Sequence, residues 1–218
     1  MTRAPDRQRL VIAVDGPAAS GKGTLSRKIA AHYGLAHLDT GSLYRAVAHA
    51  LLKAGKKIDD EAAAVEAART LDLANIDEQA IRGVQIGEAA SIVAPMAPVR
   101  EALAQLQLKF AARPQGAVLD GRDIGTVICP DATVKLFVTA SAKTRAHRRF
   151  LELVESNQGV KEAEILADII ARDERDASRA KSPLRMADDA HLLDTTDLDI
   201  EAAFKAAVVL VEQALKKA

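Results

Sequence analysis

The chain has 218 residues, of which 49% are hydrophobic, and its 30 basic side chains balance its 30 acidic ones. This length predicts one domain with a good core and argues against a second full domain, while the balanced charge argues against a protein that grips a long nucleic acid. Because Cys129 is the single cysteine, an internal disulfide framework is excluded; the start lacks an apolar signal core and no stretch could span a bilayer, so we expect a cytoplasmic protein.

The hydrophobic pattern predicts strands that alternate with helices. Strands are expected near residues 10–14, 36–38, 117–119, 134–138 and 191–193, and helices near 25–33, 41–54, 60–71, 87–94, 98–112, 142–155 and 161–180. Gly34 and Gly55 are expected at helix C-termini, and Ser141 is an expected N-cap. The alternation predicts a three-layer α/β fold around a parallel sheet.

The first predicted strand runs directly into a glycine-rich loop, GPAASGKGT. The loop comprises Gly16, Pro17, Ala18, Ala19, Ser20, Gly21, Lys22, Gly23 and Thr24. In the pattern G-x-x-x-x-G-K, backbone N–H groups and the following helix N-terminus cradle a polyphosphate, the lysine adds a mobile charge, and Thr24 could ligate Mg²⁺. The alternative is an ordinary glycine-bearing turn from strand to helix.

The interval between the second and third predicted strands is far longer than the dozen or so residues that a crossover requires. The helical patterns within it predict a largely helical insertion, at about residues 41–113. An insertion beside a phosphate loop commonly holds the second substrate.

Charged residues follow the second and third strands. Asp39, Thr40 and Arg45 follow the second, and Asp120, Arg122 and Asp123 follow the third. Ligands of open α/β sheets bind beyond the carboxyl ends of the strands, so two such clusters beside a phosphate loop favour a binding site. For an isolated Asp-Gly pair, the alternative is simply a turn.

The helix expected over 161–180 carries a stripe that changes from apolar to charged. The stripe comprises Ile165, Ile169, Arg172, Asp176 and Arg179. Burying the charged half away from water would cost too much free energy, so it should face a polar cleft. The alternative is that it forms a solvated ladder of i,i+4 charge pairs at the surface. An arginine-lined cleft would neutralise a transferring phosphoryl group, which favours the cleft.

Taken together, these motifs resemble those of bacterial cytidylate kinases. The similar segments are IAVDGPAASGKGT at 12–24, LDTGSLYR at 38–45, EAASIVAPMAPVREAL at 88–103, LDGRDIGTV at 119–127, RAHRR at 145–149 and RDERDASRAKSPL at 172–184. GRDIGTV and RDERDxxR together are the more specific part. Between residues 73 and 88 the chain departs from many members, which carry a longer, strand-forming insert there.

The resemblance implies a P-loop kinase fold in one domain over 1–218, with a five-stranded parallel sheet, a nucleoside-monophosphate-binding insertion and a short lid, for which 155–162 is the candidate. It implies ATP at residues 16–24, with Mg²⁺ at Thr24, and catalytic roles for Lys22, Arg122 and Arg172. The implied acceptor-binding residues are Thr40, Arg45, Ser91, Arg100, Arg122, Asp123, Arg172, Asp176 and Arg179. Among these, Ser91, Arg100 and Asp123 would lie near the cytosine edge, Asp176 on the sugar, and Arg45, Arg122 and Arg172 on the phosphate.

The implied reaction transfers a phosphoryl group from ATP to CMP or dCMP, with no nucleic acid polymer or membrane as partner, and we expect a monomer. Asp15, Asp39 or Asp120 could hold Mg²⁺ waters. Arg145, Arg148 and Arg149 could meet ATP phosphates or form a solvated basic face. Rival functions are another small-acceptor kinase, a regulatory GTPase-type switch, for which the guanine signature N-K-x-D is missing from the sequence, and a noncatalytic nucleotide-binding module.

Overall fold

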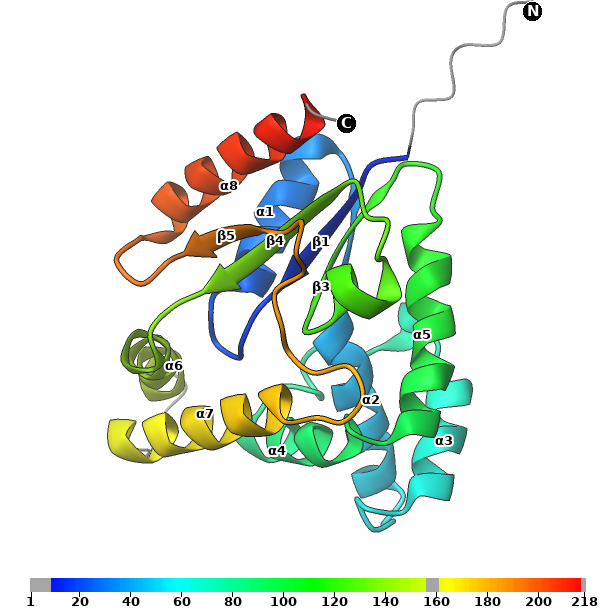
Figure 1. Ribbon diagram of the computed structural model, residues 1–218. Coiled ribbons are helices and arrows are strands. Elements are labelled where there is room, and N and C mark those ends of the chain that lie inside the picture. The colour runs from blue at the N-terminus through cyan, green and yellow to red at the C-terminus, as the bar shows by residue number, and fades with distance from the viewer. Residues whose placement is uncertain (1–8, 156–160, 217–218) are drawn as a thin grey trace, which may run out of the picture.

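A five-stranded parallel sheet forms the centre of the structure (Figure 1). The computed structural model describes residues 9–155 and 161–216. The strands are β1 (Val11–Asp15), β2 (Ala36–Asp39), β3 (Ala117–Gly121), β4 (Val134–Thr139) and β5 (His191–Asp194), in the spatial order β2-β3-β1-β4-β5. Every pairing is parallel, which confirms the predicted fold class.

Helices connect the strands close to where the pattern predicts them. They are α1 (Lys22–Tyr33), α2 (Thr40–Lys53), α3 (Glu61–Arg69), α4 (Val84–Val93), α5 (Ala97–Ala111), α6 (Ala142–Glu155), α7 (Glu162–Ala177) and α8 (Ile200–Leu215). The expected caps are present, because Gly34 and Gly55 have φ values of 65° and 64°, and Ser141 Oγ accepts a hydrogen bond from the Thr144 N–H at 3.1 Å.

The end of α7 differs from the expectation. The helix stops at Ala177 rather than 180, so Arg179 lies two residues beyond its end. Ser182 has a left-handed φ of 54° and precedes Pro183, and a residue before proline is disfavoured in the helical conformation. The charged stripe therefore spans a helix and the turn that follows it.

Alternating strand residues supply a core on each face of the sheet. Ile12, Val14 and Val118 pack with α1 and α8 on one face, whereas Ala13 and Leu119 pack toward α2 and α5 on the other. This alternation follows from the two-residue period of a strand. Helices on both faces leave the carboxyl ends of the strands as the edge where polar groups gather.

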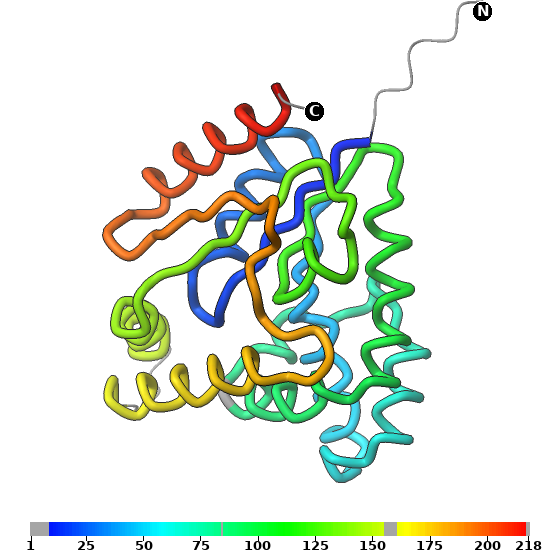
Figure 2. Tube along the Cα trace, in the orientation of Figure 1, coloured from blue at the N-terminus to red at the C-terminus, as the bar shows by residue number. Residues whose placement is uncertain are grey.

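The chain between β2 and β3 forms α2 to α5, together with a short 3₁₀ turn, η1 (Leu73–Asn75). Residues 76–83 are turns and extended chain, so the short segment at 73–88 forms no strand. Figure 2 shows these helices gathered on one side of the molecule. In Figure 1, α6 and α7 lie at the end toward which the arrow of β4 points.

The segment after β3 forms a π-helical turn, η2 (Ile124–Ile128), which the sequence pattern did not predict. Asp15 at the end of β1 holds its start, because both carboxylate oxygens accept backbone hydrogen bonds, from Ile124 at 2.8 Å and from Gly125 at 2.7 Å. Such turns are frequent at functional sites. Next to it, burial raises the pKa of the Cys129 thiol to about 11, with the nearby charge of Asp15 adding to the effect.

In the parts of the chain that the structure describes, no helix has both the length and the apolar character needed to cross a membrane.

Two glycines with left-handed backbones allow a matched test of packing at the sheet. A Cβ on Gly116, whose φ is 82°, would lie 2.4 Å from the Leu10 carbonyl oxygen, whereas one on Gly55 would meet nothing within 4 Å. We expect Gly55→Ala to lower the free energy of unfolding by about 1 kcal/mol and Gly116→Ala by ~3 kcal/mol or more. Urea unfolding of both variants measures the difference, and equal losses would contradict the clash.

Candidate active site

The glycine-rich loop joins β1 to α1 and places its backbone at the helix N-terminus. Gly16 must be glycine, because a Cβ there would lie 2.0 Å from the Val138 carbonyl oxygen. Ala19 and Gly21 both have positive φ values, of 58° and 81°. Lys22 is 8% exposed, and its ammonium folds back to donate to the Pro17 carbonyl at 3.1 Å. The sequence thus forms the strand, loop and helix that a polyphosphate cradle requires.

Lys22 lies in a site where a positive charge is costly. Burial, followed by repulsion from Arg122, lowers the pKa of its ammonium to about 7, although Asp120 and Asp39 act in the opposite direction. A bound anion would supply the missing negative charge. The lysine is therefore arranged to gain a favourable interaction when a phosphate group arrives.

The ends of β2 and β3 bring two carboxylates side by side, since Asp39 is in register with Asp120. Asp39 pairs with Arg45 at 2.8 Å, and Asp120 pairs with His37 Nε2 at the same distance. Thr40 donates to the Asp120 carbonyl at 2.8 Å. The two charged clusters that follow these strands in the sequence therefore meet at one edge of the sheet.

The three aspartates considered for Mg²⁺ waters have different surroundings. Both oxygens of Asp15 are occupied by η2, and burial raises the pKa of Asp15 to about 6 against the effect of those hydrogen bonds. Asp39 is paired with Arg45. Asp120 keeps Oδ1 beside the glycine-rich loop, 3.8 Å from where a Cβ on Gly23 would lie.

Oxygen ligands are available for Mg²⁺, because the Thr24 hydroxyl and the Asp120 carboxylate flank the loop. Within residues 9–155 and 161–216, no group of three or more His, Cys, Asp or Glu side chains could by itself hold a metal. Mg²⁺ typically uses one or two protein oxygens and completes its shell with water and phosphate. The donor set fits that pattern.

The charged half of the α7 stripe is buried rather than solvated. Asp176 is 1% exposed, and its two oxygens accept from Arg122 Nε, at 2.8 Å, and from Arg179. Burial alone would raise the pKa of Asp176, but the charges of Arg122 and Arg179 outweigh it and hold the pKa below the ordinary value. The solvated-ladder alternative is therefore wrong.

Arg172 is the uncompensated member of this cluster. Its Nε is buried and has no hydrogen-bond partner. Burial, followed by repulsion from Arg122, lowers the pKa of the guanidinium to about 10. With Arg45 and Arg179 also nearby, positive charge exceeds what Asp176 can balance. Binding of an anion to this cluster would be favourable, because the anion would accept a hydrogen bond from a buried donor and would reduce the repulsion among the arginines.

A third group of side chains lies between α4, α5 and η2. Arg100 forms a buried ion pair with Asp123 and donates to the Ala94 carbonyl at 3.2 Å, and its guanidinium lies 5.6 Å from the centre of the Tyr44 ring. Ser91 donates to the Glu88 carbonyl one turn earlier, at 2.7 Å. The pair of Arg100 and Asp123 offers both a donor and an acceptor to a neutral polar ligand.

Two of the three arginines in RAHRR are used inside the protein. Arg145 binds the Ala18 carbonyl of the loop and Asp173 of α7, and Arg148 binds the Thr195 and Leu198 carbonyls. Arg149 is paired with Glu152 at the surface. The solvated basic face thus holds for Arg149 alone. The lid predicted at 155–162 falls largely outside the described residues, which omit 156–160.

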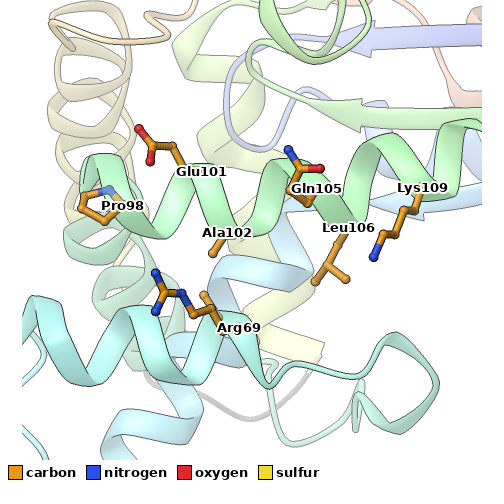
Figure 3. A pocket seen from close by; sticks show the side chains of 8 residues that line it. Arg69, Pro98, Glu101, Ala102, Gln105, Leu106 and Lys109 are labelled. Atoms are coloured by element: carbon orange, nitrogen blue, oxygen red, sulfur yellow. The ribbon is translucent and has the colours of Figure 1, made fainter.

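The cavities of the structure add little to this site. One of about 490 Å³ lies between α3 and α5, away from every predicted site residue (Figure 3). Ala102, Leu106 and Lys109 point from α5 toward α3 in that view, while Glu101 and Gln105 point away. A smaller cavity of about 150 Å³ borders Arg100 and Asp123.

Several residues of the site were missed by the sequence analysis. No role was assigned from the sequence to His37, Tyr44, Asp173 or η2. Tyr44, Asp173 and the start of η2 fall inside quoted motifs, but what each of them does is recognised only through its partners in the structure. Asp15 was considered for Mg²⁺ but supports η2 instead. The glycines on either side of Arg122 and Asp123 allow the chain to turn sharply after β3, but they do not specify a π-helical turn.

A family model and curated relatives both identify the same family of proteins. A family model described as cytidylate kinase matches residues 12–213. The protein named cytidylate kinase from Azorhizobium caulinodans is 63% identical over 205 residues, which cover 94% of this chain and 99% of that one. The one from Xanthobacter autotrophicus is 62% identical over 203 residues, covering 93% and 97% of the two chains.

Solved structures show the same fold at low identity. A shikimate kinase from Bacteroides thetaiotaomicron superposes with a TM-score of 0.52 at 15% identity, over 93% of this chain and 98% of that one. An uncharacterized protein from Eubacterium ventriosum gives 0.56, also at 15% identity, over 94% and 99%. These likenesses concern the fold alone.

The lowered pKa of Lys22 predicts how pH controls polyphosphate binding. The free protein loses the Lys22 proton near pH 7, and a bound polyphosphate favours the charged form, so the lysine's contribution is complete below pH 7 and falls as pH rises above it. We expect the ratio of wild-type to Lys22→Met association constants for inorganic tripolyphosphate to fall by up to about tenfold per pH unit above 7. Calorimetry from pH 6 to 9 measures this ratio, in which ionisation of the ligand cancels. A constant ratio would contradict the prediction.

Proposed function

This chain belongs to the cytidylate kinase family, and on that premise we propose that it transfers the γ-phosphoryl group of ATP to CMP or dCMP, giving ADP and CDP or dCDP. The observation that carries the proposal is the excess of buried positive charge around Arg172, next to a phosphate loop. Such an excess suits a site that brings two phosphate-bearing substrates together.

The donor is ATP, bound by residues 16–24, with Lys22 on its phosphates. Support comes from the backbone of the loop at the N-terminus of α1 and from the lowered pKa of Lys22. Mg²⁺ would be held by the Thr24 hydroxyl, and the Asp120 carboxylate would accept hydrogen bonds from waters bound to the ion. When bound, the ion supplies charge neutralisation between the phosphates.

The acceptor lies between the inserted helices and α7. Arg45, Arg122 and Arg172 bind its phosphate, and Asp176 accepts from the sugar hydroxyls while Arg179 holds that carboxylate in place. Arg100, Asp123 and Ser91 contact the cytosine edge. Thr40, fixed by its hydrogen bond to the Asp120 carbonyl, lies between the two substrates.

The chemistry requires no covalent enzyme intermediate. An oxygen of the CMP phosphate attacks the γ-phosphorus in line, while the bond from the γ-phosphorus to the bridging oxygen breaks and ADP leaves. The attacking oxygen is already anionic, so no general base is needed. Lys22, Arg122 and Arg172 act by holding the reacting oxygens together and by balancing their charge.

The proposal also includes the division of the chain. The helices within about 41–113 form the acceptor-binding insertion of a single domain. ATP and CMP or dCMP are the partners, with no nucleic acid polymer and no membrane, and the protein acts as a cytoplasmic monomer. Balanced charge and the single cysteine support this setting.

The rival functions make different use of the same loop. A GTPase-type switch or a noncatalytic module would have no use for the buried arginines beyond the phosphate loop, whereas a second anionic substrate uses them. Kinases for other small acceptors differ at the base edge. Arg100 and Asp123 therefore distinguish a cytidylate kinase from its relatives.

Base choice is the first test of the proposal. Cytosine presents an amino donor beside a ring acceptor, which matches the acceptor of Asp123 and the donor of Arg100, whereas uracil presents a carbonyl against Asp123. We expect CMP and dCMP to exceed UMP in kcat/KM by ~10² to 10⁵, with AMP and dTMP poor substrates. A coupled ADP-release assay across these nucleotides measures it.

Asp123→Asn should narrow the ratio of CMP to UMP, because the amide can donate to the uracil carbonyl. The exposed Asp131→Asn, in the loop before β4, is the matched control and should leave the ratio unchanged. Efficient use of UMP or AMP by the wild type would reassign the acceptor. An unchanged ratio in Asp123→Asn would place base recognition elsewhere.

Arg172 provides a second test, which separates binding from stability. Arg172→Ala should raise the KM for CMP by ~10² and lower kcat, with the KM for ATP nearly unchanged. Because it removes a buried cation whose Nε lacks a partner, the variant should unfold at the same or a higher temperature than the wild type. Asp176→Ala should also raise the KM for CMP.

Steady-state kinetics and thermal unfolding measure both effects of Arg172→Ala, and Arg175→Ala, on the exposed side of α7, is the control. Wild-type kinetics in both Arg172→Ala and Asp176→Ala would contradict their assignment to the acceptor.

A further inference from the structure

Arg145 joins three segments that are far apart in the sequence. Its side chain, 5% exposed, comes from the first turn of α6. Nε donates to the Ala140 carbonyl at 2.8 Å, and Nη1 donates to the Ala18 carbonyl in the glycine-rich loop at 3.1 Å. Nη1 and Nη2 of the guanidinium also donate to Asp173 on α7. The guanidinium therefore contacts the loop and both helices at once.

Asp173 completes this arrangement with a bidentate pair. Its two oxygens accept from Arg145 Nη1 at 3.0 Å and from Nη2 at 2.6 Å, and its side chain is 29% exposed. Asp173 follows Arg172 directly and precedes Asp176 by one helical turn, yet it pairs with α6 and not with the acceptor arginines. Fork-to-fork pairs fix orientation as well as distance.

Apolar packing makes the same connection. Ala146 and Leu153 of α6 form a small core with Ile165 and Ile169 of α7, and Ala19 of the loop packs against it. Ala19 has a left-handed φ of 58°, a strained conformation for alanine, and the carbonyl just before it is the one that Arg145 holds. A shift in the loop would therefore displace α6 and α7 as well.

We propose that Asp173 is a positioning residue that acts through Arg145 to couple the two substrate sites. It ties the loop that binds ATP to the helix that carries Arg172 and Asp176, so that each substrate favours the arrangement in which the other binds. This inference rests on the proposed function. The role of Asp173 follows from its bidentate pair with Arg145 and requires no direct contact with a substrate.

Coupling of this kind is reciprocal and can be measured at equilibrium. If an ATP analogue tightens CMP binding by some factor, CMP tightens the analogue by the same factor, and such factors commonly lie between about 5 and 150. A residue with a merely structural role would change both affinities and leave their coupling factor unaltered. The coupling factor is therefore the decisive quantity.

The experiment is titration calorimetry of CMP into the full-length protein, with and without saturating Mg²⁺ and a nonhydrolysable β,γ-imido analogue of ATP. We expect the analogue to tighten CMP binding by about tenfold in the wild type, and by less than about twofold in Asp173→Asn. Asp173→Glu, which keeps the carboxylate, should restore most of the coupling. Asp168→Asn, an exposed change on the same helix, should behave like the wild type.

Arg145→Lys gives an independent test, because lysine keeps the charge but loses the fork. The double variant of Arg145→Lys and Asp173→Asn should lose no more coupling than either single variant, since both break one connection. Wild-type coupling in Asp173→Asn, or no coupling in a wild type that binds both ligands, would overturn the inference alone. A wild type that does not bind CMP would overturn the proposed function, and this inference with it.

Discussion

Burial of like charges at the carboxyl edge of the sheet is the constraint on which the rest of the site depends. Burial is the main cause that lowers the pKa values of both Lys22 and Arg172, and repulsion from Arg122 adds to it, so one guanidinium destabilises a cation on each side of the proposed transfer. Each phosphate that binds there would remove part of the repulsion.

The surrounding carboxylates are held by donors in a way that limits how far they can neutralise this charge. Asp15 is bound to η2, Asp120 is bound to His37, and Asp176 bridges Arg122 and Arg179. Because η2 begins directly after Asp123, the carboxylate at the end of β1 fixes the segment that carries Arg122 and Asp123. The fold thus positions the cluster mainly through buried hydrogen bonds.

Much of the fold could be predicted because its signals are local. The five strands, the loop that follows β1 and most helices appear as runs or periods in the sequence, and they are found within a few residues of the expected positions. The π-helical turn has no period of its own, and the bond from Arg145 to Ala18 joins residues 127 apart. The motifs indicated which charged residues belong to the site, and their roles toward substrates remain predictions. The buried state of Asp176 depends on Arg122, which follows β3, and on Arg179 in the turn after α7, and spacing along one helix cannot show either partner.

The order of the strands has a consequence for how the protein is made on the ribosome. The central strand β1 pairs with β3 and β4, so its first partner is residue 117 and its second is residue 134. Synthesis proceeds from the N-terminus, and a nascent chain that has not reached Val134 leaves an apolar strand with an open edge. Such long-range pairing forms slowly, because the chain loses the entropy of loop closure before the stabilising contacts between the strands are made. The helices between β2 and β3 can form early, whereas the phosphate loop acquires its fixed shape only when Val138 and Arg145 have been added.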